Sequence, residues 1–203
     1  MIWLLYFIAS FVIMVICYLT NPIVCLFSDE EGELHGFLNY WQTWDDSLNP
    51  RFFVMEKVPS FLRYDYDRHY EEYQGTTPEL ERVGRTRWFC RVKDPNFTFW
   101  EKIQRYCCQV LWLTRNCSYG FSFWLLGREV DPKDITWPTA DEHTRHGYEK
   151  DKSILTRTWT FQCDAHWFWK IRWEIYLGWK VGYELDHLSQ CMIANRIAIR
   201  FED

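Results

Sequence analysis

The sequence is poor in the residues that mark fibrous and low-complexity proteins. Its 203 residues include only 9 Gly and 7 Pro, which excludes a collagen-like or low-complexity chain. Hydrophobic residues make up 48% of the chain and charged residues 25%, so general disorder is excluded as well. A chain of this length forms one domain, or one domain with an appendage, and it can bury a sizeable core without metals or disulfides.

The chain also lacks a strong excess of positive charge. Its net charge is −5, and residues 1–81 carry 13 acidic against 4 basic side chains, whereas residues 82–203 carry 15 against 19. This balance argues against a dedicated nucleic-acid-binding protein. The composition is unusual instead in its aromatic content, with 13 Trp, 12 Tyr and 15 Phe.

Familiar catalytic motifs are missing. The sequence has no G-x-S-x-G, H-E-x-x-H, P-loop or G-x-G-x-x-G pattern, so the interpretation leans away from an enzyme, and no cofactor is expected. An active site assembled from distant residues stays open as an alternative. The eight cysteines include no C-x2-C pair, which is typical of small buried residues in a reducing compartment.

Two histidines form the best metal-binding candidate. His143 and His146 are three residues apart and follow Asp141-Glu142, a spacing at which a helix could share a cation between them. The segment lies between Pro138 and Gly147, however, so we expect a solvated loop and no metal site.

The N-terminus contains no charged side chain. Residues 1–27 lack Asp, Glu, Lys and Arg, and Ile2 to Leu19 is an apolar run broken only by Ser10. Its 18 residues reach the lower length limit for a membrane-spanning helix, which Asn21-Pro22 would end. We predict a single-pass membrane anchor over residues 1–27, of open orientation because no basic residue precedes Arg51. A helix buried in a soluble core or an oligomer interface is the main alternative, and the missing basic start disfavours a cleaved signal peptide.

The rest of the chain predicts one α+β domain over residues 28–203. Residues 28–81 are acidic and irregular, and residues 127–153 are polar and read as a long loop. Helical spacing of apolar residues predicts an amphipathic helix over residues 98–114, and the short apolar run 121–126 is ambiguous. Alternation over residues 154–203, with every odd position from 167 to 185 apolar, predicts a C-terminal antiparallel β-meander that bends at Gly178 or Gly182.

A shorter alternation over residues 82–93 predicts a strand with a mainly basic outer face. Its candidate binding residues are Arg85, Arg87, Trp88 and Arg91, and Arg82, Phe89 and Lys93 lie beside them. We favour a solvated strand face, ahead of anionic lipid headgroups and then single-stranded nucleic acid.

Four segments carry a resemblance to a known family. They are Asn21-Pro22-Ile23-Val24, residues 41–48 (WQTWDDSL), residues 115–121 (RNCSYGF) and Gly178-Trp179-Lys180. Together they resemble a family of uncharacterised proteins of tailed bacteriophages, with an N-terminal hydrophobic segment and an R-N-x-x-Y-G-F element. That family carries a proline after the Arg-Asn pair, where this chain has Cys117. The resemblance implies a phage origin and a bacterial host membrane, and it brings no known activity or cofactor.

We expect the motif residues to have structural roles. The set is Trp41, Asp45, Asp46, Arg115, Asn116, Tyr119 and Gly120. Arg115 and Asn116 can bind the last carbonyls of the preceding helix. Asp45 and Asp46 face opposite ways on an extended chain, so we expect a turn here, not an acid–base pair, and we predict an ion pair of one of them with Arg115.

These observations favour a membrane-anchored bacteriophage accessory protein that binds a host or phage protein. The aromatic-rich surface and the basic strand would form its contact region, because Trp, Tyr and Arg dominate binding hot spots. The alternative is a structural component of the virion, in the capsid or tail, with the N-terminal helix packed between subunits or delivered to a membrane. Nucleic acid is not an expected partner.

Overall fold

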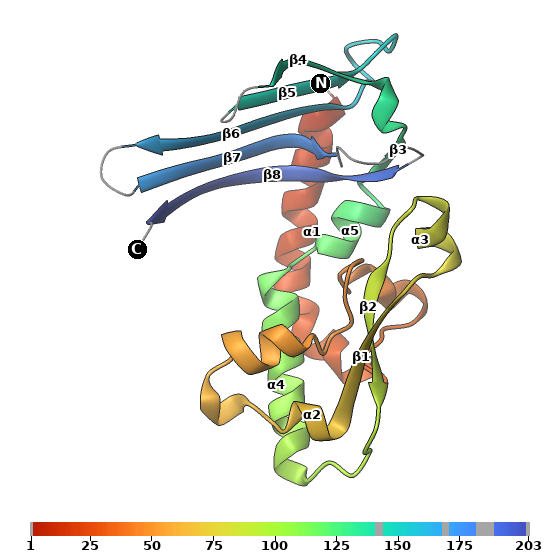
Figure 1. The fold of residues 1–203 in the computed structure, drawn as a ribbon, viewed down its shortest axis with the longest axis vertical. Coiled ribbons are helices and arrows are strands. Elements are labelled where there is room, and N and C mark those ends of the chain that lie inside the picture. Colours follow the sequence, from red (N-terminus) through yellow and green to blue (C-terminus); the bar gives the residue numbers. More distant parts are fainter. Residues whose placement is uncertain (1, 141–143, 168–170, 182–188, 202–203) are drawn as a thin grey trace. The chain divides into compact units, whose positions relative to one another are not determined.

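The structure, a computed structural model, describes residues 2–140, 144–167, 171–181 and 189–201. It is an α+β fold with an apolar N-terminal helix and a six-stranded antiparallel sheet (Figure 1). Contacts divide the chain into two units. The sheet unit comprises Met1–Ser10, Arg82–Gly84 and Ser122–Asp203, and the helical unit comprises Phe11–Glu81 and Arg85–Phe121.

Helix α1 (Ile2–Val24) confirms the helix expected at the N-terminus. It does not stop at Asn21-Pro22 but includes Pro22 and leads into the 3-10 turn η1 (Cys25–Phe27). Val24 and Cys25 are both buried in the main core cluster, and this packing stabilises the turn after the proline.

The sheet unit contains six strands in the order β3-β8-β7-β6-β5-β4. Their bounds are β3 (Arg128–Val130), β4 (Ile135–Ala140), β5 (Thr144–Glu149), β6 (Trp159–Trp167), β7 (Ile171–Lys180) and β8 (Ser189–Phe201). Strands β6, β7 and β8 pair antiparallel in chain order, as the predicted meander requires. The expected loop over residues 127–153 is wrong, because it contains β3, β4, β5 and the 3-10 turn η5 (Pro132–Asp134). Strand β4 lies at the sheet edge, where a strand tolerates a residue such as Pro138.

Gly178 does not break the meander. It lies inside β7 with a φ of 100°, and a Cβ at this position would be 2.1 Å from the carbonyl oxygen of Trp159 on β6. The glycine therefore allows the two strands to approach closely. Gly182, the other candidate for the bend, lies outside the described residues.

The helical unit is built around α4 (Phe99–Arg115), which confirms the helix predicted over residues 98–114. Thr98 caps its N-terminus in a capping box with Glu101. A two-stranded hairpin pairs β1 (Tyr70–Gly75) with β2 (Arg87–Val92). The remaining short elements are η2 (Gly36–Tyr40), η3 (Phe53–Lys57), η4 (Ser60–Leu62), α2 (Tyr66–His69), α3 (Pro78–Arg82) and α5 (Tyr119–Trp124).

The strand predicted over residues 82–93 is shorter than expected, and its faces differ. Strand β2 begins at Arg87, and Arg82 ends helix α3. Arg87 and Cys90 are buried, while Trp88 and Arg91 are exposed, so burial does not follow the two-residue period. The ambiguous run 121–126 belongs in part to helix α5.

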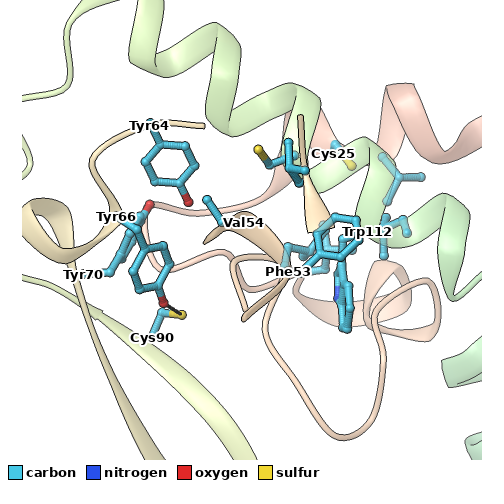
Figure 2. Close-up of a cluster of buried hydrophobic side chains, with 14 residues drawn as sticks. Cys25, Phe53, Val54, Tyr64, Tyr66, Tyr70, Cys90 and Trp112 are labelled. Carbon is cyan, nitrogen blue, oxygen red and sulfur yellow. Dashed lines mark hydrogen bonds between the residues drawn. The ribbon is translucent and has the colours of Figure 1, made fainter. Parts of the chain in front are cut away.

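The main core of the helical unit gathers side chains from helices α1 and α4, from the hairpin and from the irregular segment between them (Figure 2). The ring of Phe53 lies 5.1 Å from that of Trp112 on α4. The Tyr66 hydroxyl and the Cys90 thiol are hydrogen-bonded at 3.1 Å. Residues 28–81, which showed no sustained period, are thus ordered by tertiary packing.

Candidate functional site

Three of the four segments that carry the family resemblance meet in the helical unit. We call residues 21–24, 41–48 and 115–121 the motif junction. The Trp41 Nε1 donates to the Thr20 hydroxyl at 2.9 Å, and the Asn21 amide donates to the Cys117 sulfur at 3.9 Å. The Cys117 thiol donates to the Met14 carbonyl at 3.3 Å. The junction therefore joins α1 to the loop around Trp41 and to the turn after α4.

Aromatic rings and one glycine close the junction. The Trp41 ring meets Phe121 edge-on at 4.8 Å, and the Trp44 ring stacks on Tyr119 at 6.5 Å. A Cβ on Gly120 would lie 2.1 Å from the carbonyl oxygen of Gln42, so only glycine fits there. Trp41, Tyr119 and Gly120 thus take part in the packing of the junction.

The fourth segment also contacts α1, within the sheet unit. Trp179 on β7 is completely buried. Its ring meets Tyr6 of α1 edge-on at 6.0 Å and Trp159 of β6 at 6.5 Å, and its Nε1 donates to the Leu126 carbonyl at 3.4 Å. All four segments therefore contribute side chains that contact α1 or belong to it.

The predicted ion pair of Arg115 with Asp46 is not formed. Among the described residues, the Arg115 guanidinium lies over the Phe53 ring at 5.6 Å, and the charge that faces Asp46 is Arg87. Arg115 is exposed at the end of α4, whereas Asp46 is buried, so the two side chains do not meet. Asn116 does bind a late carbonyl of the helix: its amide donates to Trp112 O at 3.3 Å.

Arg87 is the centre of a buried polar cluster with Glu33, Gln42 and Asp46. Its Nη2 donates to both Glu33 carboxylate oxygens at 2.9 Å and to the Asp46 carbonyl at 3.0 Å. Gln42 donates to Glu33 at 2.8 Å and accepts from the Leu34 amide at 2.8 Å. These partners explain why Arg87 points inward, against the sequence prediction, because a buried guanidinium requires a carboxylate and further acceptors.

Burial dominates the ionisation of both carboxyl groups in this cluster. It raises the pKa of Asp46 to about 8, with help from Glu72 and Asp45, against the lowering effects of the Ser47 amide and Arg87. Burial likewise raises the pKa of Glu33, although Arg87 and Gln42 oppose it. The charge of Arg87 thus lowers the pKa of both carboxyl groups, and burial outweighs it in each case.

This cluster links separate segments of the chain. Its hydrogen bonds join the backbone of residues 34 and 46 to strand β2, and both ends of the Glu33–Arg87 ion pair are largely buried. Sequence reasoning missed Glu33 and Gln42. No local signal relates them to Arg87, because the contact joins residues 54 positions apart.

The remaining predicted binding residues do not form one surface. Trp88 and Arg91 are exposed, and Arg85 is partly buried, with its guanidinium 5.6 Å from the Trp44 ring. In the hairpin, Arg91 lies 5.0 Å over the Tyr73 ring, which stacks on Phe89. Trp88 pairs with Gln74 in the adjacent register position, and so it belongs to the opposite face of the hairpin. We call Tyr73, Phe89 and Arg91 the hairpin face.

The largest exposed apolar feature belongs to α1 and η1. Twelve large apolar side chains here are between 42% and 74% exposed. They are Leu4, Leu5, Ile8, Phe11, Val12, Val15, Ile16, Tyr18, Leu19, Ile23, Leu26 and Phe27, and we call them the α1 stripe. The segment Ile2–Phe27 has a mean hydropathy of 2.5 and is long and apolar enough to cross a membrane. A core helix or a signal sequence can have the same length and composition, so the stripe's exposure adds an independent observation.

The structure describes only one histidine of the metal candidate. His143 lies outside the described residues, and His146 packs its ring against Phe161 at 4.6 Å. Within the described residues, no group of three or more His, Cys, Asp and Glu side chains is placed to hold a metal ion.

The model of a family of unknown function (DUF7338) matches residues 1–201. No curated protein and no solved structure matches the chain.

Proposed function

The chain belongs to this family of unknown function, and we propose that it is a membrane-anchored accessory protein of a tailed bacteriophage. In this proposal α1 holds the protein at the host cell membrane, and the rest of the chain binds a host or phage protein without catalysing a reaction. The phage origin rests on the family resemblance of the four sequence segments.

The single observation that supports anchoring is the α1 stripe. Burying one large aliphatic side chain completely contributes roughly 1.5–3 kcal/mol. The twelve stripe residues are about half exposed, so their full burial adds on the order of 10 kcal/mol as an upper estimate. A contiguous stripe of this size on a soluble chain marks an interaction surface. With no charge in residues 1–27, a lipid phase suits it.

The hairpin face is the proposed partner contact. Its exposed Arg91 and Tyr73 combine a guanidinium with an aromatic ring, a pairing enriched in binding hot spots. The Arg87 guanidinium lies 4.6 Å over the Phe89 ring of this face, but it is buried and bound by Glu33, so we assign it no direct contact with the partner.

Flotation with neutral phosphatidylcholine vesicles tests the anchor. The full chain should float with the vesicles, and high salt should not release it, because the stripe contains no charge. Leu19→Lys, at the most exposed stripe residue, should lower the partition coefficient roughly tenfold or more. Ile154→Lys is the matched control: Ile154 is 73% exposed, against 74% for Leu19, and lies outside the stripe.

Two results would contradict the anchor. Unbound protein at the bottom of the gradient would remove the membrane from the proposal. Equal loss of flotation in both lysine variants would show that general surface hydrophobicity, not α1, drives binding.

A virion role is the second candidate, and one observation favours it. The side of α1 opposite the stripe already packs on protein through Cys17, Asn21 and Val24, so the stripe could pack on a neighbouring subunit in the same way. Density-gradient fractionation of infected cells separates the two functions. Recovery with membranes after alkaline carbonate supports the accessory protein, and recovery in purified particles supports the virion component.

A further inference from the structure

We infer that α1 does not cross the bilayer but lies in one leaflet, with its stripe among the acyl chains and its other side still packed on the protein. This inference rests on the proposed membrane function and specifies its topology. It replaces the single-pass arrangement expected from the length of the apolar run.

Helix α1 has two different sides. Its most buried residues are Ser10, Cys17, Asn21 and Val24, each at most 5% exposed. They follow one another at intervals of seven, four and three, which places them on one side of a helix. The stripe residues occupy the other side at the same periodicity. An apolar helix of this kind needs cover on both sides, and the protein supplies it on only one.

Hydrogen bonds hold the buried side of α1 in place. The Trp41 indole binds Thr20, Cys117 binds Met14, and the Tyr106 hydroxyl donates to the Pro22 carbonyl at 2.8 Å. The Pro22 carbonyl is one of the groups that a helix end leaves without an internal partner. In the acyl region it would have to find another one.

The first turns of α1 are held as well, within the sheet unit. The Trp3 ring lies 5.2 Å from Trp159, and the Tyr6 ring lies 6.0 Å from Trp179. These contacts and those of the motif junction involve the segments that carry the family resemblance. Packing of α1 along its length is therefore part of the fold.

A spanning helix would have to give up all of these contacts. Lipid surrounds a single spanning helix, so α1 would leave the junction and expose to water the apolar side chains that now pack on Val24 and Cys25. Insertion of the stripe into one leaflet breaks none of them. Helices that lie in the interface usually present a charged side to water; here the protein takes the place of water.

Lipid fits the stripe better than a second copy of α1 does. A two-helix seam uses two positions in every seven, whereas six of the nine residues from Phe11 to Leu19 are exposed stripe residues. Close pairing of helices in membranes also uses small residues at the contact, and the stripe contains only large ones. It continues past the helix end through Leu26 and Phe27, which are 67% and 63% exposed.

Protease accessibility distinguishes the two topologies. The full chain, with one peptide tag at each end, is bound to intact phosphatidylcholine vesicles from outside and isolated by flotation. We expect external protease to remove both tags, because both ends stay on the side of addition. An N-terminal tag that is protected until detergent opens the vesicles would overturn the inference and leave the anchor itself intact.

The native cysteines give a second readout. The Cys117 sulfur lies beside α1, 3.3 Å from the Met14 carbonyl, and its side chain interacts with that of Cys17, so an added diazene such as diamide can join the two thiols. The two thiols lose two protons and two electrons to the N=N bond, which gives a disulfide and a hydrazine. We expect the same cross-link in buffer and on vesicles, and none in Cys117→Ser.

The failures of the two proposals look different. Loss of the Cys17–Cys117 cross-link on vesicles, with flotation retained, overturns only the one-leaflet topology. Protein that does not float and forms a stable dimer in buffer overturns the membrane function and shows that the stripe binds a second copy.

Discussion

Replacing Asp46 by an asparagine should make the protein's stability less dependent on pH. Asp46 is 7% exposed, and its Oδ1 has no hydrogen-bond partner among the described residues. Burial is the main reason why its pKa rises from 3.8 to about 8. Between these two values the folded chain holds a proton that the unfolded chain releases, so the stability of the folded state falls as pH rises.

The size of this effect follows from the shift. One pKa unit corresponds to about 1.4 kcal/mol. With the folded pKa at about 8, raising the pH from about 4.5 to about 7.5 costs the wild-type chain about 4 kcal/mol at this one group. The amide in Asp46→Asn does not titrate, so this variant does not lose that stability. The difference in the free energy of unfolding, variant minus wild type, should therefore rise by about 4 kcal/mol between the two pH values.

Denaturant unfolding of both proteins at several pH values measures the difference. Asp67→Asn is a control of opposite sign, because a hydrogen bond with Arg51 lowers the pKa of Asp67. Removing this carboxylate should therefore lower the free energy of unfolding more at high pH than at low pH. A constant difference between wild type and Asp46→Asn across the range would refute the reasoning, since it would mean that Asp46 titrates alike in both states.

Two further predictions concern close packing and the buried ion pair. Gly120→Ala should cost about 3 kcal/mol, because its Cβ would meet the Gln42 backbone. Gly36→Ala should cost only about 1 kcal/mol, since nothing lies within 4 Å and only its φ of 60° is strained; equal thermal shifts for the two would contradict this. Arg87→Met should cost about 3–5 kcal/mol by leaving Glu33 buried without its partner, and adding Glu33→Gln should restore part of it. A double variant no more stable than Arg87→Met would show that the ion pair is not the cause.

Local periodicity was sufficient to predict helix α4 and strands β6, β7 and β8. The helix over residues 98–114 and the three C-terminal strands each repeat apolar residues at the period of their structure, and Thr98 and Glu101 carry a capping signal. The loop predicted over residues 127–153 was wrong because β4 and β5 contain many polar residues and a proline. β5 pairs with β6, and β4 pairs with β5; this pairing makes them strands, and it is not visible in the local sequence.

Arg87 shows the same limit at the level of one side chain. Alternation placed it with Arg85 and Arg91 on an outer face, and its charge supported that placement. The structure turns it inward because Glu33, Gln42 and the Asp46 carbonyl together satisfy the guanidinium. A pattern in residues 82–93 contains no information about acceptors 41 to 54 positions before Arg87 in the chain.

Length and composition were enough to establish that residues 2–27 form an uncharged apolar helix, because both are local properties of the chain. That one side of this helix is packed on protein while the other is exposed follows from tertiary packing alone. The free energy of an apolar side chain falls when it leaves water, whatever then covers it. The composition of α1 therefore could not indicate what lies against each of its sides. The side chains that pack on it come from segments up to 173 positions away, as the contact of Tyr6 with Trp179 shows.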